Sequence, residues 1–250
     1  MLARVLMVSV VLPLSAVAQV DPGCGSDTDC QALAPKLEKQ CKARKTEKPC
    51  LQLAAVLIQG KGLKRDLKRA LGLFTAACER KDATGCYQQA AMLDEGVGAP
   101  KDSARAVALY EPLCAKKVLA ACEDLANHLA EGDGVTRDLR RAETLHQQAC
   151  DGGEGRACTN LATLCAEGTL GKRELKRALE LDTRGCELDS APSCNSLGFA
   201  FVTGRGAPKD QAKAEELFKK SCALGSDDGC TNRKRLCGDG FKPACAPASK

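Results

Sequence analysis

Apolar residues recur at helical spacing in two short runs within each segment of the chain. In the stretch 122–157, the first run consists of Leu125, Ala126 and Leu129, and the second consists of Ala142, Leu145 and Ala149. Gly132 and Gly134 separate the two runs, and Asp138 stands where a second helix would begin. The pattern predicts an αα-hairpin, which is a pair of helices joined by a glycine-containing turn.

The same pattern returns every 36 residues. The glycine that would end the first helix of each hairpin occurs at Gly60, Gly96, Gly132, Gly168 and Gly204. One series of cysteines stands at Cys50, Cys86, Cys122, Cys158, Cys194 and Cys230, and a second stands eight positions earlier at Cys78, Cys114, Cys150, Cys186 and Cys222. A fixed period of this length indicates an all-α solenoid, in which each hairpin stacks on the next because it cannot bury its apolar face alone.

The residues around each turn predict how the helices begin and end. An acidic residue stands at the expected start of each second helix, at Asp66, Asp102, Asp138, Glu174 and Asp210, and aspartate is a better N-cap than glutamate. A second turn glycine recurs at 62, 98, 134 and 206, but position 170 is Leu and the glycine is Gly171. We therefore expect a distorted turn in that repeat.

The N-terminus has the pattern of a secretory signal. Residues 1–18 contain Arg4, an apolar run over 5–14 and the small-residue cleavage pattern at 16–18. A membrane anchor is the alternative, but the run is shorter than the roughly 20 residues that a spanning helix needs. We expect residues 1–18 to be a signal peptide, 19–40 an N-terminal cap, 41–237 the repeats and 238–250 a C-terminal tail.

Composition narrows the function classes further. All 17 cysteines follow the signal, and this density in an exported chain predicts disulfides rather than a metal centre or redox catalysis. The net charge of +5 is modest and only 3% of the residues are aromatic, which argues against nucleic-acid binding. We expect no cofactor, no metal site and no membrane contact after signal cleavage.

The repeated motif resembles a known family. The pattern L-A/G-x-x-L-x-x-G-x-G-V-x-x-D-x-x-K/R-A, with its 36-residue period over about residues 41–237, is similar to Sel1-like repeats, which are relatives of tetratricopeptide repeats. The added cysteine pairs resemble the secreted, cysteine-rich branch that includes the Helicobacter cysteine-rich proteins. The resemblance implies a right-handed α-superhelix of hairpins stapled by disulfides.

The cysteine spacing also predicts the pairing. Each pair would join the last turn of one hairpin to the first turn of the next, across a short loop. The expected disulfides are Cys41–Cys50, Cys78–Cys86, Cys114–Cys122, Cys150–Cys158, Cys186–Cys194 and Cys222–Cys230, with Cys24–Cys30 and Cys237–Cys245 at the two ends. Zinc is the alternative ligand, but structural zinc pairs usually stand two to four residues apart. Cys165 is left over in a slot that holds Leu or Phe in other repeats, which favours a buried thiol over a reactive one.

Polar positions on the first helix of each hairpin are the candidates for binding. In a Sel1-like solenoid these helices line the concave side, and amide and carboxylate side chains there can hydrogen-bond an extended polypeptide. The candidate residues are Gln52, Gln88, Asp124, Asn127, His128, Asn160 and Ser196. The alternative is that they form only a solvated helix face.

We therefore expect a periplasmic or secreted scaffold that binds a protein, peptide or cell-wall fragment, such as a peptidoglycan fragment, in its concave groove. The alternative is a β-lactamase or penicillin-binding activity, because some cysteine-rich Sel1-like proteins carry a β-lactamase label. The repeats contain no S-x-x-K, S-D-N or K-T-G motif, and two histidines are too few for a zinc hydrolase. The sequence thus identifies no catalytic residue.

Overall fold

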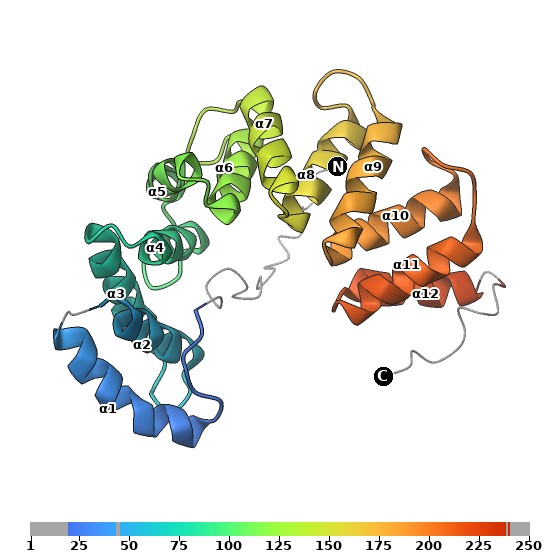
Figure 1. Ribbon diagram of the computed structural model, residues 1–250. Coiled ribbons are helices and arrows are strands. Elements are labelled where there is room, and N and C mark those ends of the chain that lie inside the picture. The colour runs from blue at the N-terminus through green and yellow to red at the C-terminus, as the bar shows by residue number, and fades with distance from the viewer. Residues whose placement is uncertain (1–19, 44–45, 239, 241–250) are drawn as a thin grey trace, which may run out of the picture. The chain divides into compact units, whose positions relative to one another are not determined.

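The computed structural model describes residues 20–43, 46–238 and 240, and within them the chain is all-α, as the sequence predicts (Figure 1). The described residues form twelve helices and no strand. The helices are α1 (Asp27–Ala43), α2 (Lys48–Gln59), α3 (Leu67–Glu79), α4 (Ala83–Glu95), α5 (Ser103–Ala115), α6 (Leu119–Glu131), α7 (Leu139–Asp151), α8 (Gly155–Glu167), α9 (Leu175–Glu187), α10 (Ala191–Thr203), α11 (Gln211–Ala223) and α12 (Asp227–Gly238). The signal peptide expected over 1–18 lies outside the described residues.

The ends of the helices follow the expected turn chemistry. Gly132 closes α6 in the left-handed conformation, with φ 80°, and its backbone N–H donates to the carbonyl oxygen of His128. A side-chain oxygen of Asp138 accepts from the backbone N–H of Arg141 at 3.0 Å and so caps α7. Glu174 makes no such cap bond at the start of α9. Aspartate therefore caps α7 whereas glutamate does not cap α9, as the sequence predicts.

The chain divides into two compact units, Met1–Leu109 and Tyr110–Lys250, although its sequence repeats predict a single continuous array. Among the described residues of the first unit, α1 to α4 enclose a core that includes Leu53, Leu57 and Met92. In the second unit, consecutive helices from α6 to α12 pack as hairpins. The boundary falls inside α5.

One core position of the second helix of each hairpin carries a large side chain. Counting in steps of 36 residues, this position is occupied by Phe74, Tyr110, His146, Asp182 and Phe218. The three aromatic residues and His146 are at most 2% exposed, so each ring fills the interior of its hairpin. Asp182 is the exception, because a short carboxylate stands where the other repeats have a ring.

Seven disulfides join cysteines that both lie among the described residues, and they are pairs that the cysteine spacing predicts. They join Cys24–Cys30, Cys41–Cys50, Cys78–Cys86, Cys114–Cys122, Cys150–Cys158, Cys186–Cys194 and Cys222–Cys230, with Cα atoms 4.3 to 5.2 Å apart. Six of them link the end of one helix to the start of the next. The expected Cys237–Cys245 pair lies partly outside the described residues, because Cys245 is not among them.

The second glycine of a turn packs closely on the preceding second helix. A Cβ atom on Gly98, where φ is +80°, would lie 2.5 Å from the carbonyl oxygen of Leu67 at the start of α3. Gly206 makes the equivalent approach to Leu175. Gly171, in the turn that departs from the pattern, has φ +122° and no atom within 4 Å of such a Cβ. The turn after α8 therefore lacks the close contact found at Gly98 and Gly206.

Replacing Gly98 with Ala is expected to lower the free energy of unfolding by about 2 kcal/mol or more, because the new methyl group meets backbone and the φ angle is unfavourable for Ala. Gly72→Ala is the matched control. Gly72 lies in the middle of α3 with open space around it, so this change is expected to stabilise by roughly 0.5–1 kcal/mol. Urea denaturation of both variants checks the difference, and similar values for the two would contradict the packing contact.

Candidate binding pocket in the C-terminal unit

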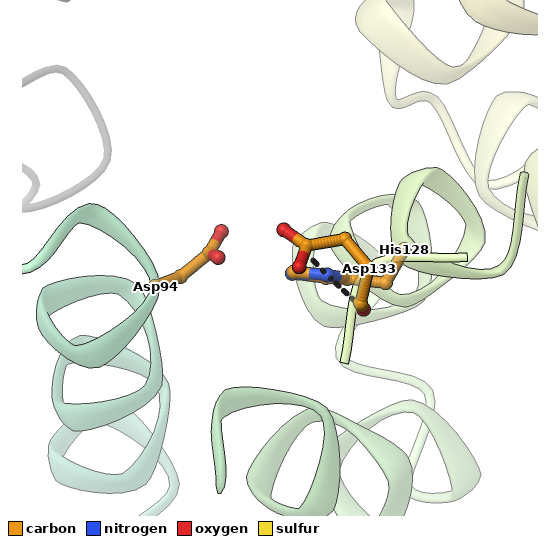
Figure 2. Close-up of side chains that lie close together, drawn as sticks. All are labelled: Asp94, His128 and Asp133. Atoms are coloured by element: carbon orange, nitrogen blue, oxygen red, sulfur yellow. Dashed lines mark hydrogen bonds and ion pairs between the residues drawn. The ribbon is translucent and has the colours of Figure 1, made fainter. Parts of the chain in front are cut away.

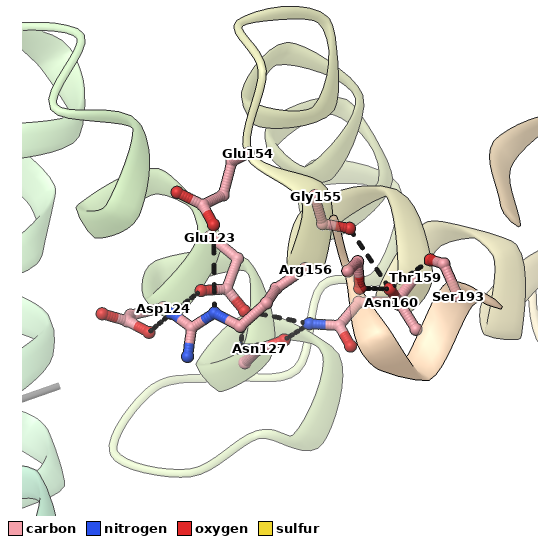
Figure 3. A network of polar contacts seen from close by, with 10 residues as sticks. Glu123, Asp124, Asn127, Glu154, Gly155, Arg156, Thr159, Asn160 and Ser193 are labelled. Atoms are coloured by element: carbon pink, nitrogen blue, oxygen red, sulfur yellow. Dashed lines mark hydrogen bonds and ion pairs between the residues drawn. The ribbon is translucent and has the colours of Figure 1, made fainter. Parts of the chain in front are cut away.

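Two of the predicted binding residues hold neighbouring repeats together. The side-chain amide of Asn160 on α8 donates to Oδ1 of Asn127 on α6 at 2.8 Å and to Oε1 of Glu123 at 3.1 Å (Figure 3). Asn127 also donates to Glu123, at 3.0 Å. A similar pair joins α10 and α12, where Asn232 donates to Asn195. These amides therefore stabilise the stacking of first helices, a role that the sequence interpretation did not include.

Glu123 is the buried centre of this network. Its side chain is 3% exposed, and its carboxylate lies 2.6 Å from the guanidinium of Arg156. Burial raises the pKa of the Glu123 carboxyl, and the charge of Arg156 and the hydrogen bond from Asn127 only partly offset that effect. Arg156 also reaches Asp124, another candidate, at 3.9 Å.

The remaining candidates have different environments. Gln88 and His128 are 1% and 6% exposed, so they belong to the interior and not to an open groove. Nδ1 of His128 lies 2.9 Å from the backbone oxygen of Asp133, in the turn that follows α6 (Figure 2). Gln52 is half-buried beside Gly23 in the first unit. Of the predicted residues, only Ser196 lines the pocket that opens among α8, α9 and α10.

A pocket with a volume of about 380 Å³ opens among α8, α9 and α10. Its apolar walls include Ala162, Ala178 and Leu179, and Phe199 is 47% exposed beside them. The charged lining residues are Glu167, Arg173, Asp182 and Arg205. Asp182 is partly buried whereas the other three are exposed, so the pocket combines one partly buried carboxylate with exposed charges of both signs.

The carboxylate of Asp182 is unusual in its surroundings. Its Oδ1 atom is fully buried and has no hydrogen-bond partner among the described residues. Burial raises the pKa of Asp182 to about 7, and a hydrogen bond with Ser193 opposes this only in part. A buried oxygen without a partner costs free energy. Asp182 therefore brings to the lining of the pocket a carboxylate with an unpaired acceptor oxygen.

The pocket follows from the side chain at this core position. In the hairpin formed by α10 and α11, the ring projects from the second helix toward the small residue of the first helix, because a Cβ on Gly198 would lie 2.7 Å from the ring of Phe218. Ala162 occupies the equivalent small position opposite Asp182, and both line the pocket. The sequence interpretation did not identify Asp182 as a candidate residue. The 36-residue register contains the signal that would have identified it.

Cys165 is the free cysteine among the described residues and is 1% exposed. Burial raises the pKa of its thiol, so the neutral form is favoured. This environment agrees with the interpretation of Cys165 as a small apolar side chain.

Helical hairpins in a 36-residue register define a protein of the repeat-scaffold class. The model of the Sel1 repeat family matches residues 50–82, 83–117, 119–154, 155–190 and 191–226. The chain therefore belongs to the Sel1 repeat family.

Solved structures share this fold at low sequence identity. A Sel1 repeat protein from Oxalobacter formigenes has a TM-score of 0.74 and 19% identity, over 87% of this chain and 94% of that one. The protein c5321, described as a protective antigen of uropathogenic Escherichia coli with an SLR fold, has a TM-score of 0.64 and 21% identity, over 87% of this chain and 45% of that one. Helicobacter pylori cysteine rich protein B has a TM-score of 0.39 and 21% identity, over 69% of this chain and 98% of that one.

No curated protein matches the chain by sequence. The comparisons give no support to the β-lactamase alternative. Within the described residues, none of the helices has the length and apolar character that crossing a membrane requires.

Proposed function

We propose that this protein is an exported scaffold that binds a segment of a partner protein, with the pocket among α8, α9 and α10 as the anchor point. Sel1 repeats generally mediate protein–protein interaction. The observation that carries the proposal is the half-exposed ring of Phe199 beside a 380 Å³ pocket with apolar walls and polar groups. Pockets with this mixture of surfaces are typical binding sites.

The adjoining surface suits an extended polypeptide. Thr163 and Ser196 line the pocket on α8 and α10, and Asn195 and Asn232 continue the polar surface toward α12. Hydroxyl and amide groups can donate to and accept from a peptide backbone without demanding one sequence. A partner segment would therefore take its affinity from the pocket and its orientation from these helices.

The seven disulfides support export as part of the same proposal. Structural disulfides persist in oxidising compartments and are rare in the cytosol of mesophiles. We propose the periplasm or the external medium as the location, in agreement with the expected signal at 1–18.

Selection of a random peptide library on the oxidised protein tests the proposal. Enriched peptides are expected to bind the wild-type protein and a Leu224→Ala variant alike, and to bind Phe199→Ala at least tenfold more weakly in a fluorescence-anisotropy titration. Leu224 is the matched control, because it is an exposed apolar residue of the same unit, 39% exposed, that does not line the pocket. The absence of any enriched peptide, or binding that does not depend on Phe199, would contradict the proposed site.

A further inference from the structure

We infer that the pocket receives a basic side chain of the partner, an arginine or a lysine, whose charged group pairs with the carboxylate of Asp182. This inference rests on the proposed function and specifies the chemistry of the anchoring residue.

Asp182 differs in size and exposure from the residues at the equivalent positions. Phe74, Tyr110, His146 and Phe218 are buried rings, whereas Asp182 is a shorter side chain, only partly buried, that lines the pocket. Because protein interiors are closely packed, the pocket beside this shorter side chain can take a group supplied from outside. The opening between Ala162 and Leu179 is apolar and suits the methylene stem of a long side chain.

The hydrogen bonds of the Asp182 carboxylate are incomplete. Oδ1 of Asp182 lacks a partner, and the group that would complete it must be a donor. An apolar ligand would leave this oxygen unpaired, and an anionic ligand would be repelled by it. A guanidinium or an ammonium supplies both the donors and the opposite charge.

The charged groups of the pocket differ in exposure. Glu167 from α8, Arg173 from the turn before α9 and Arg205 from the turn after α10 line the pocket with Asp182 and are exposed, and Ser193 from α10 hydrogen-bonds Asp182. Water therefore screens these three exposed charges, while it screens the partly buried carboxylate of Asp182 less. Phe199 offers a ring face on which a cation can also rest. The partner would therefore present a basic residue flanked by acidic ones, with the acids at Arg173 and Arg205.

Binding of this kind would depend on pH. Because the pKa of Asp182 is raised to about 7, the carboxylate is mostly ionised at pH 8 and mostly neutral at pH 5.5. A cationic side chain pairs with the ionised form, so its affinity is expected to fall roughly thirtyfold between these two values.

The experiment uses the peptide acetyl-Glu-Ala-Arg-Ala-Glu-amide and the same peptide with citrulline in place of arginine, which keeps the shape and removes the charge. Binding to the full oxidised protein is followed by NMR titration at pH 8 and pH 5.5. We expect the arginine peptide to bind wild type at pH 8 at least tenfold more tightly than the citrulline peptide. This preference is expected to disappear in Asp182→Asn and in the wild type at pH 5.5.

Asp182→Asn keeps the size of the side chain, and a thermal melt of the variant verifies that it is folded. Equal binding of both peptides by wild type, or an unchanged preference in Asp182→Asn, would overturn the inference. The two proposals can fail separately. Library peptides that need Phe199 but contain no basic residue would leave the proposed function standing and remove only the basic anchor.

Discussion

Removing the Cys150–Cys158 disulfide by a double Cys→Ala substitution is expected to lower the free energy of unfolding by about 2.5 kcal/mol. Closing a loop of about nine residues removes this much chain entropy from the unfolded state on the loop-entropy model. Both cysteines are fully buried between α7 and α8, so lost packing adds to the effect. Urea denaturation under oxidising conditions measures the change.

Cys165→Ala is the matched control for this disulfide. Its sulfur is equally buried but unpaired, so the substitution removes packing without opening a loop, and we expect a loss of about 1 kcal/mol. In excess reductant the difference between the double variant and the wild type is expected to shrink to the packing contribution of the two buried thiols. A double variant no less stable than Cys165→Ala would show that the cross-link adds nothing to stability.

Asp182→Asn is expected to stabilise the protein increasingly as the pH rises from 4 to 7. The pKa of Asp182 is about 7 in the folded protein against an ordinary value of 3.8, so the folded state binds more protons than the unfolded state between these values. The wild type therefore loses at most about 4 kcal/mol of stability through Asp182 as the pH rises through this range. The Asp182→Asn variant has no titrating group at this position and does not lose this stability. The quantity to measure is the difference in unfolding free energy between the two proteins at several pH values.

The comparison between the wild type and Asp182→Asn is needed because His146 changes the stability of the wild type with pH in the opposite direction. Burial lowers the pKa of His146 to about 4 from 6.5, so this residue makes the protein more stable as the pH rises from 4 to 6.5. The two contributions oppose each other in the wild type, and subtracting the Asp182→Asn curve isolates the carboxylate. A difference that stays constant from pH 4 to pH 8 would mean that Asp182 titrates normally.

The helices and disulfides could be predicted because local rules determine them. Apolar spacing, turn glycines and aspartate caps act within about ten residues, and each cysteine pair spans one short loop. The departure at Leu170 and Gly171 was also visible in the sequence, because it breaks the register. These features need no knowledge of how one hairpin packs on another.

The binding site could be predicted only in part. Asn127 and Asn160 are polar at positions that suggested an open groove, but their amides hydrogen-bond each other and the buried Glu123. The sequence does not say whether a polar side chain turns toward solvent or toward the neighbouring repeat. The pocket depends on Asp182. The effect of Asp182 is recognised only when the absence of a ring at this position is considered together with the small residue on the facing helix.

The disulfide between Cys186 and Cys194 lies about one helical turn from Asp182 on α9 and directly beside Ser193 on α10. It joins α9, in the hairpin that lacks an interior ring, to α10 of the next hairpin, and so links two helices that line the pocket. Reduction of this disulfide removes the covalent link between α9 and α10 beside the pocket. Binding at the proposed site is therefore expected to be weaker in the reduced protein than in the oxidised one.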